Sequence, residues 1–475
     1  MRNSPFYIIL CLLFSTTWSV AQDAWSLEKC VTYARDNSIQ VKQAQISIDN
    51  AVLTEKQNKQ ARYPNLTGSS TYSSNFGRSI DPTTNTFDTR NIQSNSLSLN
   101  AGVQIYDGFQ TKNAIKQSEL DFLAAQADKE RVINDLGLSI ALAYLQVLLA
   151  QDQVTIAKNR LTQNQDQLDQ TDRLIQAGTL PRANRYAIEA QIATDEQGVI
   201  SAENALENAY LALKNQLDLD ADFALEIERP EINLPSEGDL DVFTVEALYQ
   251  QALSGQPQIK ANDYRKQSAE KGIDIAKGRL QPNLTAFGSV GTNYSNAAQR
   301  VTGFNTLVDS IPIIVGPDTY YIPQEVDVPI LEKNPYFNQL NQNLNQAVGL
   351  RLTVPIYNNG INRIAIQRAE LTVLNAEYTD ELTKRQLKAD IQQALANAKA
   401  SAKELKAAEK TVEAQRIAYE NAQKRYELGA STTFEFTSAK NDLDNALSNL
   451  AGSKYNYLFR LKVLDFYQGN EINLN

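Results

Sequence analysis

Two segments of the chain alternate strictly between apolar and polar side chains. They are LSLNAGVQI at residues 97–105 and VGLRLTVPI at residues 348–356. A period of two with a wholly apolar face is typical of a β-strand. Each follows a weaker strand candidate rich in Gly and Ser, NLTGSSTYSSNF at 65–76 and NLTAFGSVGTNY at 283–294. The pattern therefore predicts two β-hairpins, or four strands of about ten residues each.

Strands of this length and polarity suit an outer membrane, with apolar side chains toward lipid and polar side chains toward a lumen. Four strands cannot close a barrel, because the smallest transmembrane barrels have about eight. An open sheet edge inside a bilayer would leave backbone groups without hydrogen bonds. If these strands cross a membrane, several chains must therefore share one barrel. A small soluble sandwich is the alternative, for which the helical remainder offers no matching apolar partner.

The rest of the chain favours very long helices. Residues 109–176 and 360–427 contain no proline and are rich in Ala, Gln, Leu, Lys, Glu and Asn. Each predicts a helix of about 68 residues, or ~100 Å, and a return helix of about 34 residues is expected at 182–215 and at 433–467. Further helical segments precede the strands, at 26–62 and 244–280. Stacked end to end with the return helices, they would complete a rod of paired helices.

The most apolar helical stretch is LGLSIALAYLQVLLA at residues 136–150. It is shorter than a membrane span requires, and it includes Ser139 and Gln146. We therefore expect a tightly packed helix contact at this place.

The chain consists of two copies of one unit. SLEKC at residue 26 aligns with TVEAL at residue 244, and VQIYDG at residue 103 aligns with VPIYNN at residue 354. The second alignment continues to Gly178 and Gly429, each of which interrupts a long helical pattern. Two breaks at matched positions indicate hairpin turns at the far end of the helices.

The second copy carries about 33 extra residues, all of them between QPNLT and VPIYNN. An insertion that leaves both of its flanks aligned belongs in an exposed loop. We expect a plain long loop at 297–344, and a lid or a partner site is the alternative.

The amino terminus is typical of a secretory signal peptide over residues 1–21, with a charged start, a short apolar run and the small residues Ser19-Val20-Ala21. Cys11 leaves with this segment, so Cys30 remains alone and no internal disulfide is possible. Cys30 does not directly follow the cleavage site, so we expect no lipid anchor. The predicted organisation is a first repeat, a linker, a second repeat and a short tail, at 22–217, 218–243, 244–467 and 468–475.

Composition narrows the possible functions. The formal net charge is −10 without a basic stripe, which argues against nucleic acid as a partner. The chain contains no His, so it lacks the commonest general base and a usual metal ligand. Carboxylates are present, but no clustered set has a defined spacing. We therefore expect no enzyme activity, no metal site and no cofactor.

Together these features resemble the outer-membrane efflux proteins of Gram-negative bacteria, the TolC-like channel tunnels. The likeness covers nearly all the mature chain. It rests on the duplicated unit, the paired glycine turns, YPNLT and QPNLT before the first strands, and VQIYDG and VPIYNNG at the end of the second. It implies a mainly α fold with a small β part. Long antiparallel helical hairpins would form a trimeric α-barrel, and four strands per chain would contribute to a shared twelve-strand transmembrane β-barrel.

The resemblance also implies a function and partners. A homotrimer in outer-membrane lipid, with its helical part in the periplasm, would serve a tripartite efflux or type I secretion system. It would passively conduct substrates from an inner-membrane pump and a periplasmic adaptor protein to the exterior. In this family the adaptor docks on the helix turns, which here are Ala177-Gly178-Thr179 and Leu428-Gly429-Ala430.

The family narrows its periplasmic mouth with polar contacts and acidic rings. Tyr426 matches a tyrosine of this closing network, Glu435 stands where an aspartate is common, and Asn184 is its counterpart in the first copy. Ser431 and Ser438 stand where the family has an arginine and a second acid. We therefore expect a weaker gate built from Tyr426, Glu435 and neighbouring amides. Three copies of Glu435 would form a carboxylate ring that favours cations.

Two other classes of protein are possible. A coiled-coil structural or adhesive surface protein would explain the helices, but it would leave the alternating strands without a role. An enzyme that uses carboxylates would need two of them close together, and nothing in the sequence places them so. Neither the exported substrate nor the class of the partner pump is indicated by the sequence.

Overall fold

The computed structural model of the chain describes residues 24–80, 85, 87–89, 91–230, 234–235 and 237–470. The predicted signal peptide and most of the predicted tail lie outside the described residues. The chain divides into two compact units, and each unit takes parts from both sequence repeats. The first unit comprises Met1–Ile48, Ala124–Asp263 and Tyr378–Asn475, and the second comprises Asp49–Leu123 and Tyr264–Glu377.

The two repeats begin with the same helix cap at matched positions. Helix α1 (Leu27–Asn37) follows Ser26, whose hydroxyl accepts a hydrogen bond from the backbone N–H of Lys29 at 3.2 Å. Helix α5 (Val245–Gly255) follows Thr244, whose hydroxyl accepts one from Ala247 at 3.3 Å. Each cap satisfies a backbone donor that the first turn of a helix leaves free, and so fixes where the helix begins.

Each of these first helices ends earlier than the sequence pattern predicted. The continuous helices expected over 26–62 and 244–280 break at Ser38 and Gln256, and helices α2 and α6 then continue over Ile39–Gln60 and Pro257–Gly278. Gln256 precedes a proline, which disfavours the helical conformation in the residue before it. At the other break, the Ser38 hydroxyl accepts a hydrogen bond from the N–H of Gln40 at 3.2 Å.

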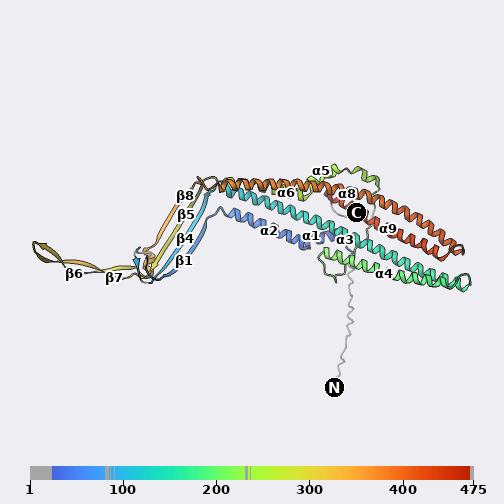
Figure 1. Cartoon of the computed structure of the whole chain (residues 1–475), viewed down its shortest axis with the longest axis horizontal. Helices are drawn as coiled ribbons and strands as arrows, with labels where there is room; N and C mark the ends of the chain where they lie inside the picture. Colours follow the sequence, from blue (N-terminus) through green and yellow to red (C-terminus); the bar gives the residue numbers. More distant parts are fainter. Residues whose placement is uncertain are drawn as a thin grey trace, which may run out of the picture. The chain divides into compact units, whose positions relative to one another are not determined.

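The long helices confirm the predicted lengths to within one residue at each end. Helices α3 (Gln110–Gln176) and α8 (Ile361–Glu427) have 67 residues each, or ~100 Å (Figure 1). The return helices are α4 (Ala183–Gln216) and α9 (Thr433–Gln468). The absence of proline lets each long backbone hydrogen-bond ladder run without interruption.

The main core of the first unit forms around the apolar stretch of α3. Ile140, Val147 and Leu148 are fully buried, together with Cys30 of α1. The Tyr144 hydroxyl donates to the backbone carbonyl of Glu228 at 2.6 Å and lies 3.0 Å from that of Trp25, which ties the inter-repeat linker to this core. Burial raises the pKa of the Cys30 thiol to about 12.

Among the described helices, α3 alone is long and apolar enough to cross a membrane by length and composition. Its apolar stretch packs against α1, α4 and α9 in the core just described. The predicted packed helix contact at 136–150 is therefore confirmed.

A second core in the same unit forms on α8. Ile391 and Ala398 are fully buried there and pack with Leu248 of α5 and Tyr457 of α9. The linker contributes Leu240 from a short 3₁₀ helix, η1 (Glu237–Val242). Both repeats therefore bury the corresponding part of their long helix.

A polar cluster, rather than an apolar one, joins α3, α4 and α9 closer to the turns. It consists of Arg160 and Asn164 of α3, Asp195 of α4, and Lys440 and Asp444 of α9. Only 2% of Lys440 is exposed, and its ammonium donates to Asn164 Oδ1 at 2.6 Å and to the Arg160 carbonyl at 3.3 Å. Asn164 in turn donates to Asp195, which forms an ion pair with Arg160 at 2.7 Å.

Burial governs the titration of this cluster. It lowers the pKa of Lys440 to about 8, although Asp444 and Asp195 nearby favour the charged form. Burial likewise raises the pKa of Asp444, whose Oδ2 accepts no hydrogen bond within the described residues and lies 3.9 Å from Arg160 Nε. The cluster therefore holds its charges at a cost in desolvation.

The second unit contains a four-stranded antiparallel sheet. Its strands are β1 (Asn65–Asn75), β4 (Ile92–Tyr106), β5 (Asn283–Ser295) and β8 (Asn345–Thr353), and they lie in that order across the sheet (Figure 1). The four predicted strands are thus confirmed. A bulge between Gln104 and Tyr106 interrupts the alternation at Ile105, and β8 ends before Val354 and Ile356. A short pair, β2 (Ser79–Ile80) and β3 (Phe87–Asp88), follows β1.

The insertion in the second repeat is regular structure, so the prediction of a plain loop at 297–344 was wrong. Strands β6 (Gln299–Val315) and β7 (Asp318–Lys333) form a long antiparallel hairpin, which is followed by α7 (Tyr336–Gln342) (Figure 1). The backbone reverses at Gly316, which has a φ of +65°. One face pairs apolar side chains, with Ile311 opposite Ile322 and Leu307 opposite Val326.

We predict that the substitution Lys440→Met flattens the dependence of stability on pH. The pKa of this lysine is about 8 in the fold and ordinarily 10.5. Between these values the unfolded chain binds a proton that the folded chain does not, so this group makes stability rise with pH, by at most ~1.4 kcal/mol per pH unit. Chemical denaturation in detergent, followed by circular dichroism from pH 7 to 10.5, should show a smaller rise for the variant.

The exposed Lys424 of α8 provides the control. The Lys424→Met variant should show the same slope of stability against pH as the wild-type protein. Equal slopes for Lys440→Met and the wild-type protein would contradict the assignment of Lys440 as a buried cation.

Candidate functional site

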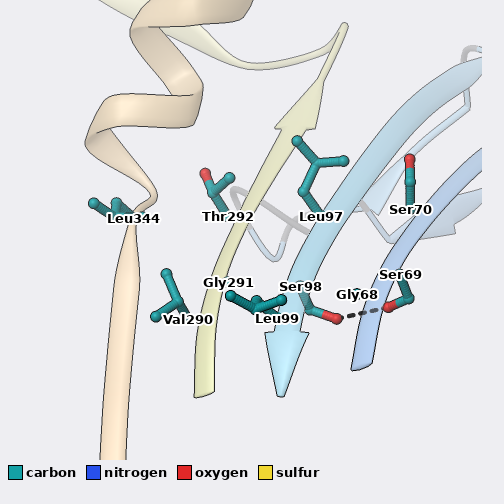
Figure 2. A pocket seen from close by; sticks show the side chains of 10 residues that line it. All are labelled: Gly68, Ser69, Ser70, Leu97, Ser98, Leu99, Val290, Gly291, Thr292 and Leu344. Atoms are coloured by element: carbon teal, nitrogen blue, oxygen red, sulfur yellow. Dashed lines mark hydrogen bonds between the residues drawn. The ribbon is translucent and has the colours of Figure 1, made fainter. Parts of the chain in front are cut away.

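One face of the four-stranded sheet is apolar. Side chains two residues apart share a face, and paired residues of neighbouring strands lie opposite each other on it. Figure 2 shows Leu97 and Leu99 of β4 beside Val290 of β5. The apolar face continues through Leu66 of β1 and Val348 of β8, and 91% of the Val348 side chain is exposed. An exposed apolar surface of this extent is typical of contact with lipid or protein.

The opposite face, which we call the polar face, carries hydroxyl and amide groups. The hydroxyls of Ser69 and Ser98, joined by the dashed line in Figure 2, lie 2.7 Å apart, and those of Ser73 and Ser94 lie 2.8 Å apart. These cross-strand hydrogen bonds hold the small side chains close to the backbone of the sheet. The face is therefore wettable, and these serine positions add little bulk.

The two edges of this sheet are unpaired within the described chain. β1 pairs with β4 only, and β8 pairs with β5 only. Each edge presents a row of backbone N–H and C=O groups that can pair with another strand. The sheet is therefore an open segment that a second strand can extend on either side.

Both turns between the long helices and the return helices have the same geometry. Gly178 and Gly429 adopt φ values of +76° and +72°. The N–H of Thr179 donates to the Leu174 carbonyl at 3.0 Å, and the N–H of Ala430 donates to the Arg425 carbonyl at 2.8 Å. The N–H groups of Gly178 and Gly429 also donate, to the carbonyls three residues earlier, at 3.0 Å each. Together these bonds form the Schellman motif that ends many helices. The predicted glycine turns are confirmed as helix ends.

Large apolar side chains are exposed around these turns. Leu428 is 83% exposed, Phe434 is 82% exposed, and Tyr186 at the start of α4 is exposed as well. Leu428 belongs to the turn predicted from the sequence, whereas Phe434 and Tyr186 were not predicted. For Phe434 a signal existed, because it follows the helix cap at Thr432 on the face opposite the buried Phe436.

Tyr426, which was expected in a gate, is buried inside one chain. It stacks on Phe436 of α9 with a ring-centre distance of 5.1 Å, and only 4% of it is exposed. Its hydroxyl lies 3.4 Å from the hydroxyls of Thr171 and Thr433. Tyr426 thus connects α8 with α3 and α9.

Glu435 remains exposed in the first turn of α9. Its carboxylate accepts a hydrogen bond from the Ser431 hydroxyl at 2.6 Å and lies 3.9 Å from Arg425. The Ser431 hydrogen bond, and a smaller effect of the Thr432 backbone, lower the pKa of Glu435. Asn184 lies half-buried on the other hairpin, and within the described residues no hydrogen bond joins it to Tyr426 or Glu435.

The described residues contain no group of three or more His, Cys, Asp or Glu side chains that could hold a metal ion. The two-faced sheet with its open edges and the two exposed turns are the candidate functional features of the described chain.

Comparison with known proteins agrees with this arrangement. The model of the family described as outer membrane efflux protein matches residues 31–217 and 248–470. The outer membrane protein TolC of Vibrio cholerae is 24% identical over 375 residues, which cover 78% of this chain and 76% of that protein.

Two solved structures show how closely the fold is shared. The outer membrane protein VceC from Vibrio cholerae superimposes with a TM-score of 0.71 at 16% identity, over 94% of this chain and 96% of VceC. The MtrE outer membrane channel of Neisseria gonorrhoeae gives a TM-score of 0.69 at 16% identity, over 95% of this chain and 90% of MtrE. Since the family model matches both repeats and most of the chain, this protein belongs to the outer membrane efflux protein family and serves as an exit duct in the Gram-negative outer membrane, with its helices in the periplasm.

Proposed function

We propose that three copies of this chain assemble into one passive, non-enzymatic duct, which a periplasmic adaptor connects to an inner-membrane pump. The observation that carries this proposal is the four-stranded sheet with one apolar face and two unpaired edges. In a bilayer such edges must be paired, because each backbone group left without a partner costs several kcal/mol. Strand β8 of one copy pairing with β1 of the next would satisfy every edge.

The polar face supports an assembly of three copies rather than two. Two copies would give eight strands, a number at which side chains fill the interior of a barrel. Three copies give twelve, and the small side chains of Ser69 and Ser98, together with Gly291, which adds only a hydrogen, would leave that larger lumen open. The apolar face, with Leu66 and Val348, would then contact lipid.

We place the adaptor on the two turns, at Ala177, Gly178, Thr179, Leu428, Gly429 and Ala430. Two features support this placement. The Schellman geometry holds both turns in a fixed shape, and beside them Leu428 and Phe434 expose apolar surface that a partner could cover. Exposed aromatic and aliphatic side chains on a rigid support are frequent anchors of protein interfaces.

We place a gate at the same turns, formed by Tyr426, Glu435 and Asn184. Tyr426 would hold α8 against α3 and α9 within each copy, because its ring and hydroxyl contact both helices. Glu435 would face the mouth, since it is exposed and fixed by Ser431. Three such carboxylates would attract cations.

The adaptor site predicts the effect of Leu428→Asp. The added charge should weaken adaptor binding at least tenfold, because an apolar anchor would have to bury a carboxylate. Export of a pump substrate by cells should fall accordingly, while the protein still purifies from outer membranes as a trimer. Binding to the purified adaptor is measured by surface plasmon resonance, and export by efflux from loaded cells.

Ile200→Asp supplies the matched control, because Ile200 of α4 is also apolar and largely exposed, at 67% against 83% for Leu428, but lies away from the turns. It should leave adaptor affinity unchanged in any trimer that forms. A wild-type protein that extracts as a soluble monomer would refute the proposed assembly itself.

The gate predicts a second outcome. In planar-bilayer recordings, Glu435→Gln should lower the ratio of cation to anion permeability by roughly twofold to fivefold, because the carboxylate ring is lost. Glu435→Asp keeps the charge and should retain the ratio. Since Ser431 lowers the pKa of Glu435, the wild-type preference should persist at pH values that begin to protonate an ordinary glutamate. An unchanged ratio in Glu435→Gln would remove Glu435 from the gate.

A further inference from the structure

The polar face of the four-stranded sheet carries a single charge. Throughout β1, β4, β5 and β8, the one Asp, Glu, Lys or Arg side chain is that of Arg351 on β8. The side chains around it on this face are hydroxyls, amides and one aromatic ring. The electrostatic character of the polar face therefore depends on this residue.

The register places Arg351 in a defined row across the sheet. Its Cα pairs with that of Thr285 on β5, which pairs with Gln104 on β4. The Thr285 hydroxyl donates to Gln104 or to Asn283, whose side-chain oxygens lie 3.3 and 3.1 Å away. Thr285, Gln104 and Asn283 are all uncharged, so none of these neighbours neutralises the arginine.

Phe287 and Gly349 support the arginine. The guanidinium lies over the Phe287 ring, 5.3 Å from its centre. The ring lies against Gly349, where an added Cβ would come within 2.9 Å of it. Only glycine at position 349 therefore leaves room for the ring in this position. The guanidinium is held by a cation–π contact that leaves its charge intact.

No carboxylate pairs with Arg351 in the described part of the chain, and the residue is exposed. Its donors are consequently free to bind an anionic group. A planar guanidinium binds carboxylate, phosphate or sulfate through two parallel hydrogen bonds.

We propose that Arg351 determines selectivity for anionic groups in the barrel lumen. This inference rests on the proposed trimer, in which three copies of Arg351 form one ring of guanidinium groups on an otherwise neutral wall. The ring favours passage of anions and of cargo that carries carboxylate, phosphate or sulfate groups. It acts in the opposite sense to the carboxylates of Glu435.

The size of the barrel makes such a ring effective. Twelve strands spaced about 4.8 Å apart and tilted about 40° give a backbone radius of about 12 Å. Guanidinium groups on the lumen side of that wall come close to a Debye length, ~8 Å at physiological ionic strength, from an ion on the axis. The ring therefore acts on the whole cross-section at low salt and fades at high salt.

The test is the reversal potential of the purified full-length trimer in planar bilayers, under a tenfold KCl gradient at low ionic strength. Arg351→Gln should lower the ratio of chloride to potassium permeability by about threefold or more, and Arg351→Lys should retain most of it. Measurements in both the wild-type and the Glu435→Gln backgrounds prevent the carboxylate ring from masking the change. Arg300→Gln removes the same charge from β6, outside the four-stranded sheet, and should have no effect.

A second variant should neutralise the ring of charges without removing Arg351. Thr285→Asp places a carboxylate opposite Arg351 on the neighbouring strand, and should reduce the anion preference to the same extent. If either variant forms channels with wild-type selectivity, the proposal is overturned. If the wild-type protein forms no trimer and no channel, it is the proposed function that fails instead.

Discussion

Backbone hydrogen bonding at the edges of one small sheet is the constraint on which the rest of this structure depends. Strands β1 and β8 each leave one side unpaired, and in lipid no water can satisfy the exposed N–H and C=O groups. A chain that contributes only four strands must therefore find its partners in other copies. Once copies share a barrel, the polar face has to line a lumen. The small serine side chains on that face then keep the lumen open.

The features that follow from periodicity could be predicted from the sequence. Alternation through Leu97, Leu99, Ala101 and Val103 identified β4 and its apolar face, because a strand places every second side chain on one side. The ends of α3 and α8 were predicted because glycine and proline mark them and no proline interrupts them. Duplication helped further, since each weak signal in one repeat was supported by its counterpart in the other.

The features that were missed depend on which surfaces meet in three dimensions. Lys440 and Asp444 look like the solvated face of a coiled-coil helix, and only the packing of α9 against α3 and α4 buries them. The stacking of Tyr426 on Phe436 of the same chain also depends on this packing and was not predicted. The loop predicted at the place of the β6–β7 hairpin rested on the absence of this segment from the first repeat, and the alternation of Ile311 and Ile313 went unused.

The environment of Cys30 has a practical consequence for chemical labelling. The described chain has one cysteine, fully buried, and burial holds its thiol in the protonated form, which does not react with maleimides or nitroxide reagents. New cysteines can thus be introduced at exposed sites without first removing the native one. Fluorescent or spin labels at such sites would then report distances between copies in an otherwise native protein.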